Sequence, residues 1–333
     1  MNRRLLRALA AMSFIAAAAF FVLCWLASSR LICPARRAVQ DYHKDILEHT
    51  LDHGMSIVRQ TLVRGEWTGT PCLVCEPLTE PGAAGKGNKL RTELEARNVP
   101  VQSWGRIIGT LVLLHGHTGR KEDHLPVAER FCAAGFRCIL IDLPGHGGHP
   151  APFASFGFRE TSLPLAALRE LSESLHFEMR PACLFGISQG GAIALQAAAA
   201  DPGTWSAVAE LSSFADLDGV IGAQASRLFG PLHSPARFIV SRLVKWRAGF
   251  DPAAVRPADA AALLGSVPVL IGHGTADTFV PTEHARALLA AVKSERKEFL
   301  EIAGTDHHDV LITSQPVYAT VAKFFLEALA ATR

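Results

Sequence analysis

The sequence has almost no net charge and no internal repeat. Its 333 residues include 33 lysines and arginines against 31 aspartates and glutamates, which gives a formal net charge of +2. A nucleic-acid-binding domain would show a clustered basic stripe, and a solenoid would show repeats of fixed period. Neither pattern is present, so we expect no nucleic-acid partner. The length is typical of one large α/β domain with an insertion.

The seven cysteines lack the partners that a metal, redox or disulfide framework requires. Cys72 and Cys75 form one C-x-x-C, but a zinc site would need a second pair or histidines at ligand spacing. A redox motif would need a helix to start after the first cysteine, whereas residues 56–75 are rich in strand-forming Val, Thr and Ile. An odd count argues against a disulfide framework. We therefore expect a structural role for this pair, no metal and no cofactor.

An apolar run opens the chain. Residues 8–27 are apolar apart from Ser13, and a helix needs about 20 such residues to span a bilayer. Arginines flank the run on both sides, at positions 3, 4, 7, 30, 36 and 37. The apolar core of a cleaved signal peptide is usually about 7–15 residues long, so we predict that residues 1–30 form a single-pass membrane anchor. Export after cleavage is the alternative, because Ala27-Ser28-Ser29 offers a small-residue cleavage site.

From residue 107 onward, short apolar runs alternate with helical stretches. The runs are IIGTLVLLHG, FRCILIDLPG, PACLFGIS, WSAVAELSS, VPVLIGHG and KEFLEIAG. Continuous apolar strands separated by helices are typical of a parallel sheet covered on both faces. We therefore predict an α/β fold with a mostly parallel central sheet and helices on both faces. Functional residues in such sheets gather in the loops at the carboxyl ends of the strands.

The composition also suggests how the chain is divided. Residues 31–105 are expected to form N-terminal strands and a Pro- and Gly-rich loop that lead into the catalytic domain, with one short helix near residues 90–97. Residues 106–333 are expected to form the catalytic domain. Within it, residues 213–265 interrupt the alternation with mixed helical sequence, and we interpret them as a helical cap over the site.

One motif carries a specific chemistry. Gly186-Ile187-Ser188-Gln189-Gly190 matches G-x-S-x-G and stands between a predicted strand and an Ala-rich helical stretch. In this context the glycines permit a sharp, strained turn that exposes the serine hydroxyl. The structural alternative is an ordinary tight turn with a capping serine. The flanking strand and helix favour Ser188 as a nucleophile.

A serine nucleophile needs a base, usually a histidine oriented by a carboxylate, and in this type of fold the chain order is Ser, Asp or Glu, His. Asp277 follows one predicted strand, and His307 and His308 follow the next. Asp306 and Asp309 adjoin the histidines, where orienting the ring from behind is awkward. Asp277 is therefore the predicted acid, and either histidine could serve as the base.

Two backbone N–H groups are expected to form an oxyanion hole. One belongs to Gln189, directly after the nucleophile, and the other comes from the loop after the first core strand, where we select His117. His115 and His117 could be mistaken for metal ligands, but no third ligand lies at usable spacing. The loop from Asp142 to His149 follows the second core strand and is expected to shape the pocket, with no metal role for its histidines.

Five segments in this order resemble the α/β-hydrolase superfamily: LLHGHTG, DLPGHGGH, GISQGG, HGTADTFVP and GTDHHDV. Residues 250–281 are similar to esterases and prolyl-oligopeptidase-like members. GTDHHDV resembles a G-x-x-H-N-D-V motif that often supplies the base in such members, with His307 at the base position and His308 where Asn often stands. The resemblance implies a triad of Ser188, Asp277 and His307.

The expected function is that of a serine hydrolase, carboxylesterase-like, which cleaves a carboxylic ester through an acyl-enzyme. A peptidase or amidase with the same triad is one alternative, and a catalytically inactive membrane-bound binding protein is another. Dehalogenase chemistry is disfavoured because the nucleophile position holds a serine. The expected partners are a small-molecule ester, lipophilic if the anchor is retained, and the membrane itself.

Overall fold

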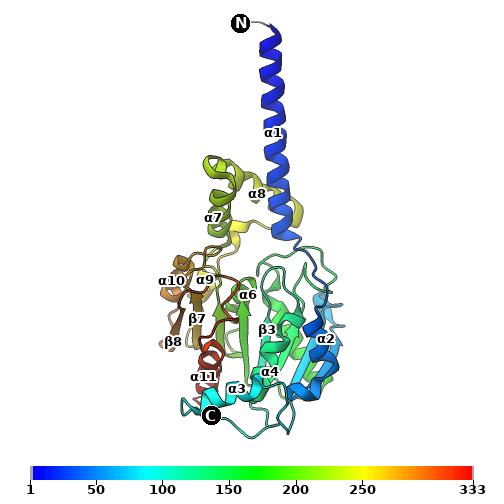
Figure 1. Ribbon diagram of the computed structural model, residues 1–333, viewed down its shortest axis with the longest axis vertical. Helices are drawn as coiled ribbons and strands as arrows, with labels where there is room; N and C mark the ends of the chain where they lie inside the picture. The colour runs from blue at the N-terminus through cyan, green and yellow to red at the C-terminus, as the bar shows by residue number, and fades with distance from the viewer. Residues whose placement is uncertain (1–2, 332–333) are drawn as a thin grey trace.

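The described residues, 3–331, fold around one eight-stranded sheet in this computed structural model (Figure 1). Its strand order is β1-β2-β4-β3-β5-β6-β7-β8. The pairs β1–β2 and β2–β4 are antiparallel and the other pairs are parallel. The strands are β1 (Met55–Thr61), β2 (Pro71–Pro77), β3 (Gly109–Leu114), β4 (Phe136–Ile141), β5 (Ala182–Ile187), β6 (Trp205–Leu211), β7 (Val269–Gly274) and β8 (Lys297–Ile302). The predicted mostly parallel sheet is confirmed.

Helices cover both faces of the sheet, as predicted. The α-helices are α1 (Arg3–Ile32), α2 (Asp41–Glu48), α3 (Lys86–Glu95), α4 (Leu125–Ala133), α5 (Leu163–Ser174), α6 (Gln189–Ala200), α7 (Leu217–Phe229), α8 (His233–Ala248), α9 (Pro257–Ala261), α10 (Thr282–Ala291) and α11 (Val317–Ala330). Short 3₁₀ helices span Thr50–His53, Gly65–Trp67, Lys121–His124, Glu160–Ser162, Gly230–Leu232 and Pro252–Ala254. Side chains of α3, α4 and α11 pack in the core on one face, and those of α5, α6, α9 and α10 pack on the other.

The central strands are buried along their whole length because each lies between these two cores. Every residue of β3 and β4 is buried. On β2, Cys72 belongs to one core and Cys75 to the other, because residues three apart on a strand point to opposite faces. The two thiols therefore cannot share a metal ion, and all seven cysteines, which lie within the described range, are free.

Helix α1 projects far beyond the body of the molecule, and α7 and α8 lie beside its C-terminal half (Figure 1). Among the described residues, only Leu6–Ile32, with a mean hydropathy of 2.3, forms a helix long and apolar enough to cross a membrane, and a signal sequence would meet the same criteria. The helix continues past residue 30, the predicted end of the anchor segment. Its last turns are part of the protein interior, because Cys24 and Ile32 are fully buried against α7, α8 and the loop at residues 153–156.

The core on the α4 side yields a stability prediction. Phe131 is fully buried, and its ring makes edge contacts with Phe136, Phe185 and Phe325 at centroid distances of 5.8–6.3 Å. Phe131→Ala should lower the free energy of unfolding by about 3–5 kcal/mol, because it leaves a cavity that the sheet cannot close. Phe158 is 45% exposed, so Phe158→Ala should cost about 1 kcal/mol or less. Denaturant unfolding of the detergent-solubilised protein measures both, and equal losses would contradict this assignment.

Candidate active site

Ser188 lies in a strained turn between the end of β5 and the start of α6. Its backbone has φ +52° and ψ −116°, a region that is costly for a residue with a side chain. The turn requires glycine on both sides. A Cβ on Gly186 would lie 2.2 Å from the carbonyl oxygen of Gly190, and one on Gly190 would lie 2.0 Å from that of Leu114. This is the sharp strand-to-helix turn that the G-x-S-x-G pattern predicts.

Two of the predicted partners meet at this serine. His307 Nε2 lies 3.0 Å from Ser188 Oγ, and His307 Nδ1 lies 2.7 Å from Asp277 Oδ2. A carboxylate only accepts hydrogen bonds, so Nδ1 donates to Asp277 and Nε2 accepts from the serine hydroxyl. All three side chains are buried. They come from loops that follow β5, β7 and β8, which end at one edge of the parallel sheet.

The competing residues lie elsewhere. His308 is exposed, and its ring packs edge-on against His307 at 5.3 Å. Asp306 accepts the backbone N–H of His307 and that of Thr278 with its Oδ1 atom. Asp309 is exposed. The geometry therefore brings His307 and Asp277 to the serine, and it leaves His308 on the rim.

Asp277 is held as an anion by its hydrogen bonds. Its Oδ1 atom accepts the N–H groups of Phe279 and Val280 at 2.9 and 2.8 Å, and its Oδ2 atom faces both His307 and His273. Burial opposes ionisation, but the bonds from His273 and His307 and the positive charge that His307 can carry hold the pKa of this carboxyl well below its ordinary value. Such a carboxylate can orient an imidazole and stabilise its protonated form.

His273 is a neighbour of the site that the sequence analysis did not identify. Its Nε2 atom lies 2.8 Å from the Val280 carbonyl and 3.3 Å from Asp277 Oδ2. The side chain therefore ties the carboxylate to the turn that follows it. Its place at the end of β7, four residues before Asp277, is the one signal that could have pointed to it.

The predicted oxyanion residues also border Ser188. Gln189 is the first residue of α6, and the first N–H groups of a helix have no partner within that helix. A Cβ on Gly116 would lie 3.6 Å from that of Ser188, so the loop after β3 runs against this serine. His117, the next residue, lines the same cavities as Ser188. Its ring stacks on Phe156, and its Nε2 atom donates to the Leu31 carbonyl of α1 at 2.9 Å.

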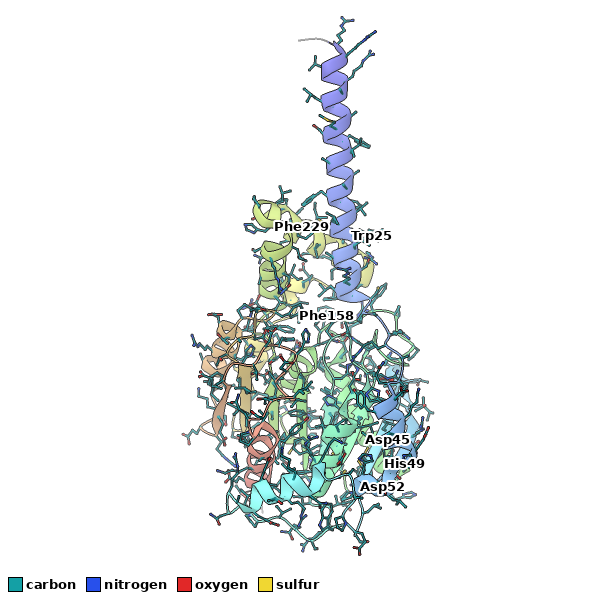
Figure 2. The ribbon with its side chains drawn as sticks, viewed as in Figure 1. Trp25, Asp45, His49, Asp52, Phe158 and Phe229 are labelled. Carbon is teal, nitrogen blue, oxygen red and sulfur yellow. The ribbon has the colours of Figure 1, made fainter. Side chains whose placement is uncertain are left out.

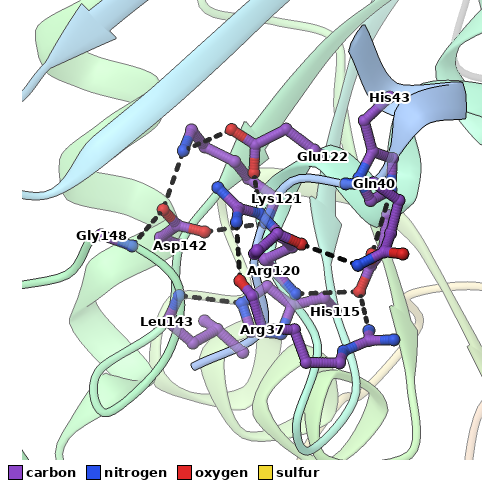
Figure 3. A network of polar contacts seen from close by, with 12 residues as sticks. Arg37, Gln40, His43, His115, Arg120, Lys121, Glu122, Asp142, Leu143 and Gly148 are labelled. Carbon is purple, nitrogen blue, oxygen red and sulfur yellow. Dashed lines mark hydrogen bonds and ion pairs between the residues drawn. The ribbon is translucent and has the colours of Figure 1, made fainter. Parts of the chain in front are cut away.

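A polar network supports the two loops that carry histidines (Figure 3). Asp142 accepts hydrogen bonds from the backbone N–H and the ammonium group of Lys121 and from the N–H of Gly148. His115 accepts the N–H of Leu143 with Nε2 and donates to the Gly116 carbonyl with Nδ1. Burial lowers the pKa of His115 to about 3, so it stays neutral in this role. Within residues 3–331 no group of three or more His, Cys, Asp or Glu side chains is placed to hold a metal ion.

The network extends to the segment that follows α1. Arg37 donates to the Thr118 carbonyl at 2.8 Å and pairs with Asp123, and Arg120 donates to the Arg37 carbonyl at 2.7 Å (Figure 3). The loop next to Ser188 is therefore fixed from both sides, by the body of the protein and by the chain that leaves α1.

Two cavities reach Ser188. The larger, of about 1140 Å³, is lined by His307, His308 and the loop after β3, and the smaller, of about 490 Å³, lies between α1 and α7. Leu26 and Arg30 of α1 line both. The sequence analysis placed a cap over the site but did not foresee that the N-terminal helix forms part of its wall.

Glu210, at the end of β6, lies fully buried beneath the turn at Ser188. Its Oε2 atom accepts the N–H of Ser213 at 2.9 Å, and a Cβ on Gly191 would lie 3.0 Å from its own Cβ. Burial raises the pKa of this carboxyl to about 8, against the opposing effects of the positive charge that His273 can carry and of the Ser213 hydrogen bond. Glu210 is therefore uncharged at neutral pH and fills space below the turn.

This raised pKa predicts a pH-dependent stability. Because the folded protein binds the Glu210 proton more tightly than the unfolded chain, the stabilisation is complete below about pH 4.5 and is lost as the pH rises through about 8. As the pH rises between these values, the free energy of unfolding of the wild type should fall by a few kcal/mol relative to that of Glu210→Gln, which keeps a neutral side chain of the same shape. Denaturant midpoints at pH 5, 6.5 and 8 measure the difference. Parallel curves for the two proteins would show that Glu210 is not held neutral.

Comparisons with known proteins agree with this fold. Residues 111–323 match the model of the alpha/beta hydrolase family. A 2-succinyl-6-hydroxy-2,4-cyclohexadiene-1-carboxylate synthase from Yersinia enterocolitica is 42% identical over 86 residues, which are 26% of this chain and only 28% of the length of that relative.

Three solved structures are similar in fold at low sequence identity. An esterase from Pyrococcus furiosus is 16% identical, with a TM-score of 0.62 over 89% of this chain and 98% of its own. A bacterial membrane phospholipase A is 15% identical, with a TM-score of 0.53 over 98% and 99%. An acylaminoacyl peptidase from Pyrococcus horikoshii is 14% identical, with a TM-score of 0.57 over 87% and 43%. Because the family model matches residues 111–323, which are most of its length, this chain belongs to the alpha/beta hydrolase family.

Proposed function

We propose that this protein is a serine hydrolase that cleaves a carboxylic ester through an acyl-enzyme. The observation that carries the proposal is the continuous hydrogen-bonded series from Ser188 through His307 to Asp277. A hydroxyl is a weak nucleophile until a base removes its proton. His307 is placed to be that base, and the ionised Asp277 is placed to stabilise the imidazolium that results.

The reaction would proceed in two halves. Ser188 Oγ attacks the ester carbonyl while His307 Nε2 takes the hydroxyl proton. The N–H groups of Gln189 and His117 donate hydrogen bonds to the carbonyl oxygen, which becomes negatively charged. His307 then returns the proton to the departing alcohol, and the acyl group remains on Ser188. In the second half a water molecule gives a proton to His307 and attacks the acyl carbon. The bond from this carbon to Ser188 Oγ then breaks, His307 returns the proton to Oγ, and the acid leaves.

The ester reading is favoured over the amide reading by the comparisons and by the surroundings of Ser188. Among the structurally similar proteins, the esterase aligns over nearly its whole length, whereas the peptidase aligns over 43% of its own. The smaller cavity at Ser188 is lined mainly by apolar residues, which suits a lipophilic ester. The similarity to the cyclohexadiene-carboxylate synthase covers too little of that relative to carry its activity over to this chain.

The triad assignment predicts a sharp contrast between adjacent histidines. Ser188→Ala should lower the turnover of nitrophenyl esters by roughly 10⁴–10⁶-fold and abolish labelling by a fluorophosphonate. His307→Ala should be impaired to a similar degree, whereas His308→Ala should stay within about threefold of wild type, because His308 bonds neither to Ser188 nor to Asp277.

The measurement is steady-state hydrolysis by the detergent-solubilised full-length protein, with thermal unfolding as the check on folding. Full activity in a folded Ser188→Ala variant would exclude the serine mechanism. A severe loss in His308→Ala alone would transfer the role of base to that residue.

We further propose that α1 is retained as a single-pass membrane anchor. The last turns of the helix are built into the enzyme: Arg247 donates to the hydroxyls of Ser28 and Ser29 at 2.8 Å, and the Ile32 carbonyl accepts the N–H of Ala154 at 2.9 Å. Cleavage at residues 27–29 would remove buried Cys24 and cavity-lining residues such as Leu26.

Retention of the anchor is directly measurable. With a C-terminal tag, the mature protein should remain in the membrane fraction after a carbonate wash, and mass spectrometry should detect peptides from residues N-terminal to Ala27. Activity should also fall in a variant truncated before Ser28 by more than solubilisation alone explains, because one wall of the cavity is lost. A soluble, fully active chain that starts at Ser28, Ser29 or Arg30 would favour the signal-peptide alternative.

A further inference from the structure

The smaller cavity at Ser188 is a narrow apolar chamber between the N-terminal helix and the cap. Its volume is about 490 Å³, within the usual size of a small-molecule site. Leu23, Leu26 and Leu31 of α1 form one wall, and Val220, Ile221 and Ala225 of α7 form the opposite wall. Phe156, Phe214 and Val280 continue the apolar lining toward the nucleophile.

Few polar groups interrupt this lining. Apart from Ser188 itself, they are His117 near the nucleophile and Arg30 and Gln224. The His117 ring already donates to the Leu31 carbonyl, and Gln224 donates to the Phe279 carbonyl at 2.8 Å. A chamber with so few free polar groups fits a hydrocarbon chain, and it does not fit a peptide or a sugar, whose polar groups would lose their hydrogen bonds to water.

Under the proposed anchoring, the position of α1 places the chamber at a membrane surface. The apolar segment Leu6–Ile32 has 27 residues, so it is about 40 Å long at 1.5 Å per residue, whereas the hydrocarbon core of a bilayer is about 30 Å thick. The first twenty or so residues suffice to cross, which leaves the turns from about Trp25 onward for the enzyme. Trp25 then lies at the bilayer interface, where tryptophan is enriched, and it packs against Trp246 of α8 at 6.1 Å.

The cap presents an apolar edge at the same level. Leu228 is 66% exposed, Phe238 60% and Trp246 74%, and Leu232 is also exposed. In Figure 2 Trp25 and Phe229 lie at a similar height in the view, and the ring of Phe229 contacts Phe20 of α1 at 5.7 Å. Large apolar side chains exposed together mark a contact surface, and the lipid around α1 is the adjoining apolar phase. Leu228 of this edge and Leu23 of α1 are both exposed and also line the chamber.

We propose that the chamber between α1 and α7 binds the hydrocarbon chain of a bilayer-resident ester, which reaches Ser188 directly from the lipid phase between these two helices. The inference rests on the proposed ester hydrolysis and adds to it the substrate class and the route of access. The membrane helix is then one wall of the substrate site as well as an anchor. The hydrocarbon chain of the substrate passes from the lipid phase into the apolar chamber, and the ester group reaches the polar atoms near Ser188.

The first test narrows the chamber from each wall. Ala225→Trp and Ala27→Trp place an indole in the chamber from α7 and from α1, and Ser226→Trp places one on the exposed side of α7 as the matched control. The full-length protein in mixed micelles is assayed with nitrophenyl butyrate and nitrophenyl palmitate. Each buried methylene contributes about fourfold to binding, so the palmitate-to-butyrate ratio of kcat/KM should fall at least about tenfold in both chamber variants and hold within about twofold in the control.

The ratio separates this inference from the proposed function. An unchanged ratio in both chamber variants, with fluorophosphonate labelling intact, overturns the chamber assignment while ester hydrolysis stands. Hydrolysis that survives in Ser188→Ala overturns the proposed function instead. If a tryptophan prevents folding, Ala225→Leu and Ala27→Leu should shift the ratio in the same direction by a smaller factor, and no shift in these milder variants also overturns the assignment.

The second test addresses the route of access. Leu232→Asp combined with Phe238→Asp places charges on the cap edge outside the chamber. Leu51→Asp is the control, because Leu51 is exposed and adjoins Asp52, at the opposite end of the molecule from α1 (Figure 2). The measured quantity is the turnover of nitrophenyl palmitate in phosphatidylcholine vesicles that hold both enzyme and substrate, divided by the turnover in micelles. This ratio should be at least about fivefold lower for the double variant than for the wild type. An equal vesicle-to-micelle ratio in wild type, control and double variant would overturn access from the bilayer.

Discussion

The structure depends on one backbone constraint, the turn at Ser188. The turn brings the carbonyl of Gly190 and that of Leu114 so close to Gly186 and Gly190 that neither position can hold a Cβ. The positive φ of Ser188 costs on the order of 1–3 kcal/mol, and it persists because β5 and α6 are buried on either side and cannot rotate to relieve it. The same strain directs the hydroxyl away from the sheet, toward the loops where His307 and Asp277 lie.

The parallel sheet then supplies the partners. Strands β3, β5, β7 and β8 end at one edge, so the loops after them meet although they are far apart in the sequence. At this edge, the charge of each buried carboxyl group depends on its own hydrogen-bond partners. Asp277 is ionised because four donors surround it, and Glu210, with one backbone donor and complete burial, stays neutral. Two carboxyl groups near the same histidine, His273, therefore differ in charge because their hydrogen-bond partners differ.

The sequence could predict what local constraints determine. Strands β3 to β7 follow from continuous apolar runs, whereas β8, at the edge of the sheet, has the charged sequence KEFLEI and is mostly exposed. The turn at Ser188 follows from glycines at fixed spacing. The choice between His307 and His308 needed the family resemblance or the fold, because adjacent histidines differ only in which side of a turn they face. His273 had only its place four residues before Asp277 to mark it among the fourteen histidines, and that place does not establish the contact, which depends on how the turn after β7 closes.

The end of α1 was hidden from the sequence for a different physical reason. Hydropathy measures preference for an apolar surrounding, and the interior of the enzyme and the interior of a bilayer satisfy Leu23, Cys24 and Ile32 equally well. A helix that begins in lipid and ends in a protein core therefore shows little change in hydropathy where its surroundings change. The helical segment Leu6–Ile32 has 27 residues and exceeds the roughly 20 that cross a bilayer, although the apolar run itself, residues 8–27, ends before Ser28, Ser29 and Arg30. The excess length of the helix is the trace that the second role leaves. Under the proposed anchoring, the same excess keeps Ser188 within reach of the membrane surface, because the last turns of α1 cannot leave the cavity wall without uncovering Cys24 and Ile32.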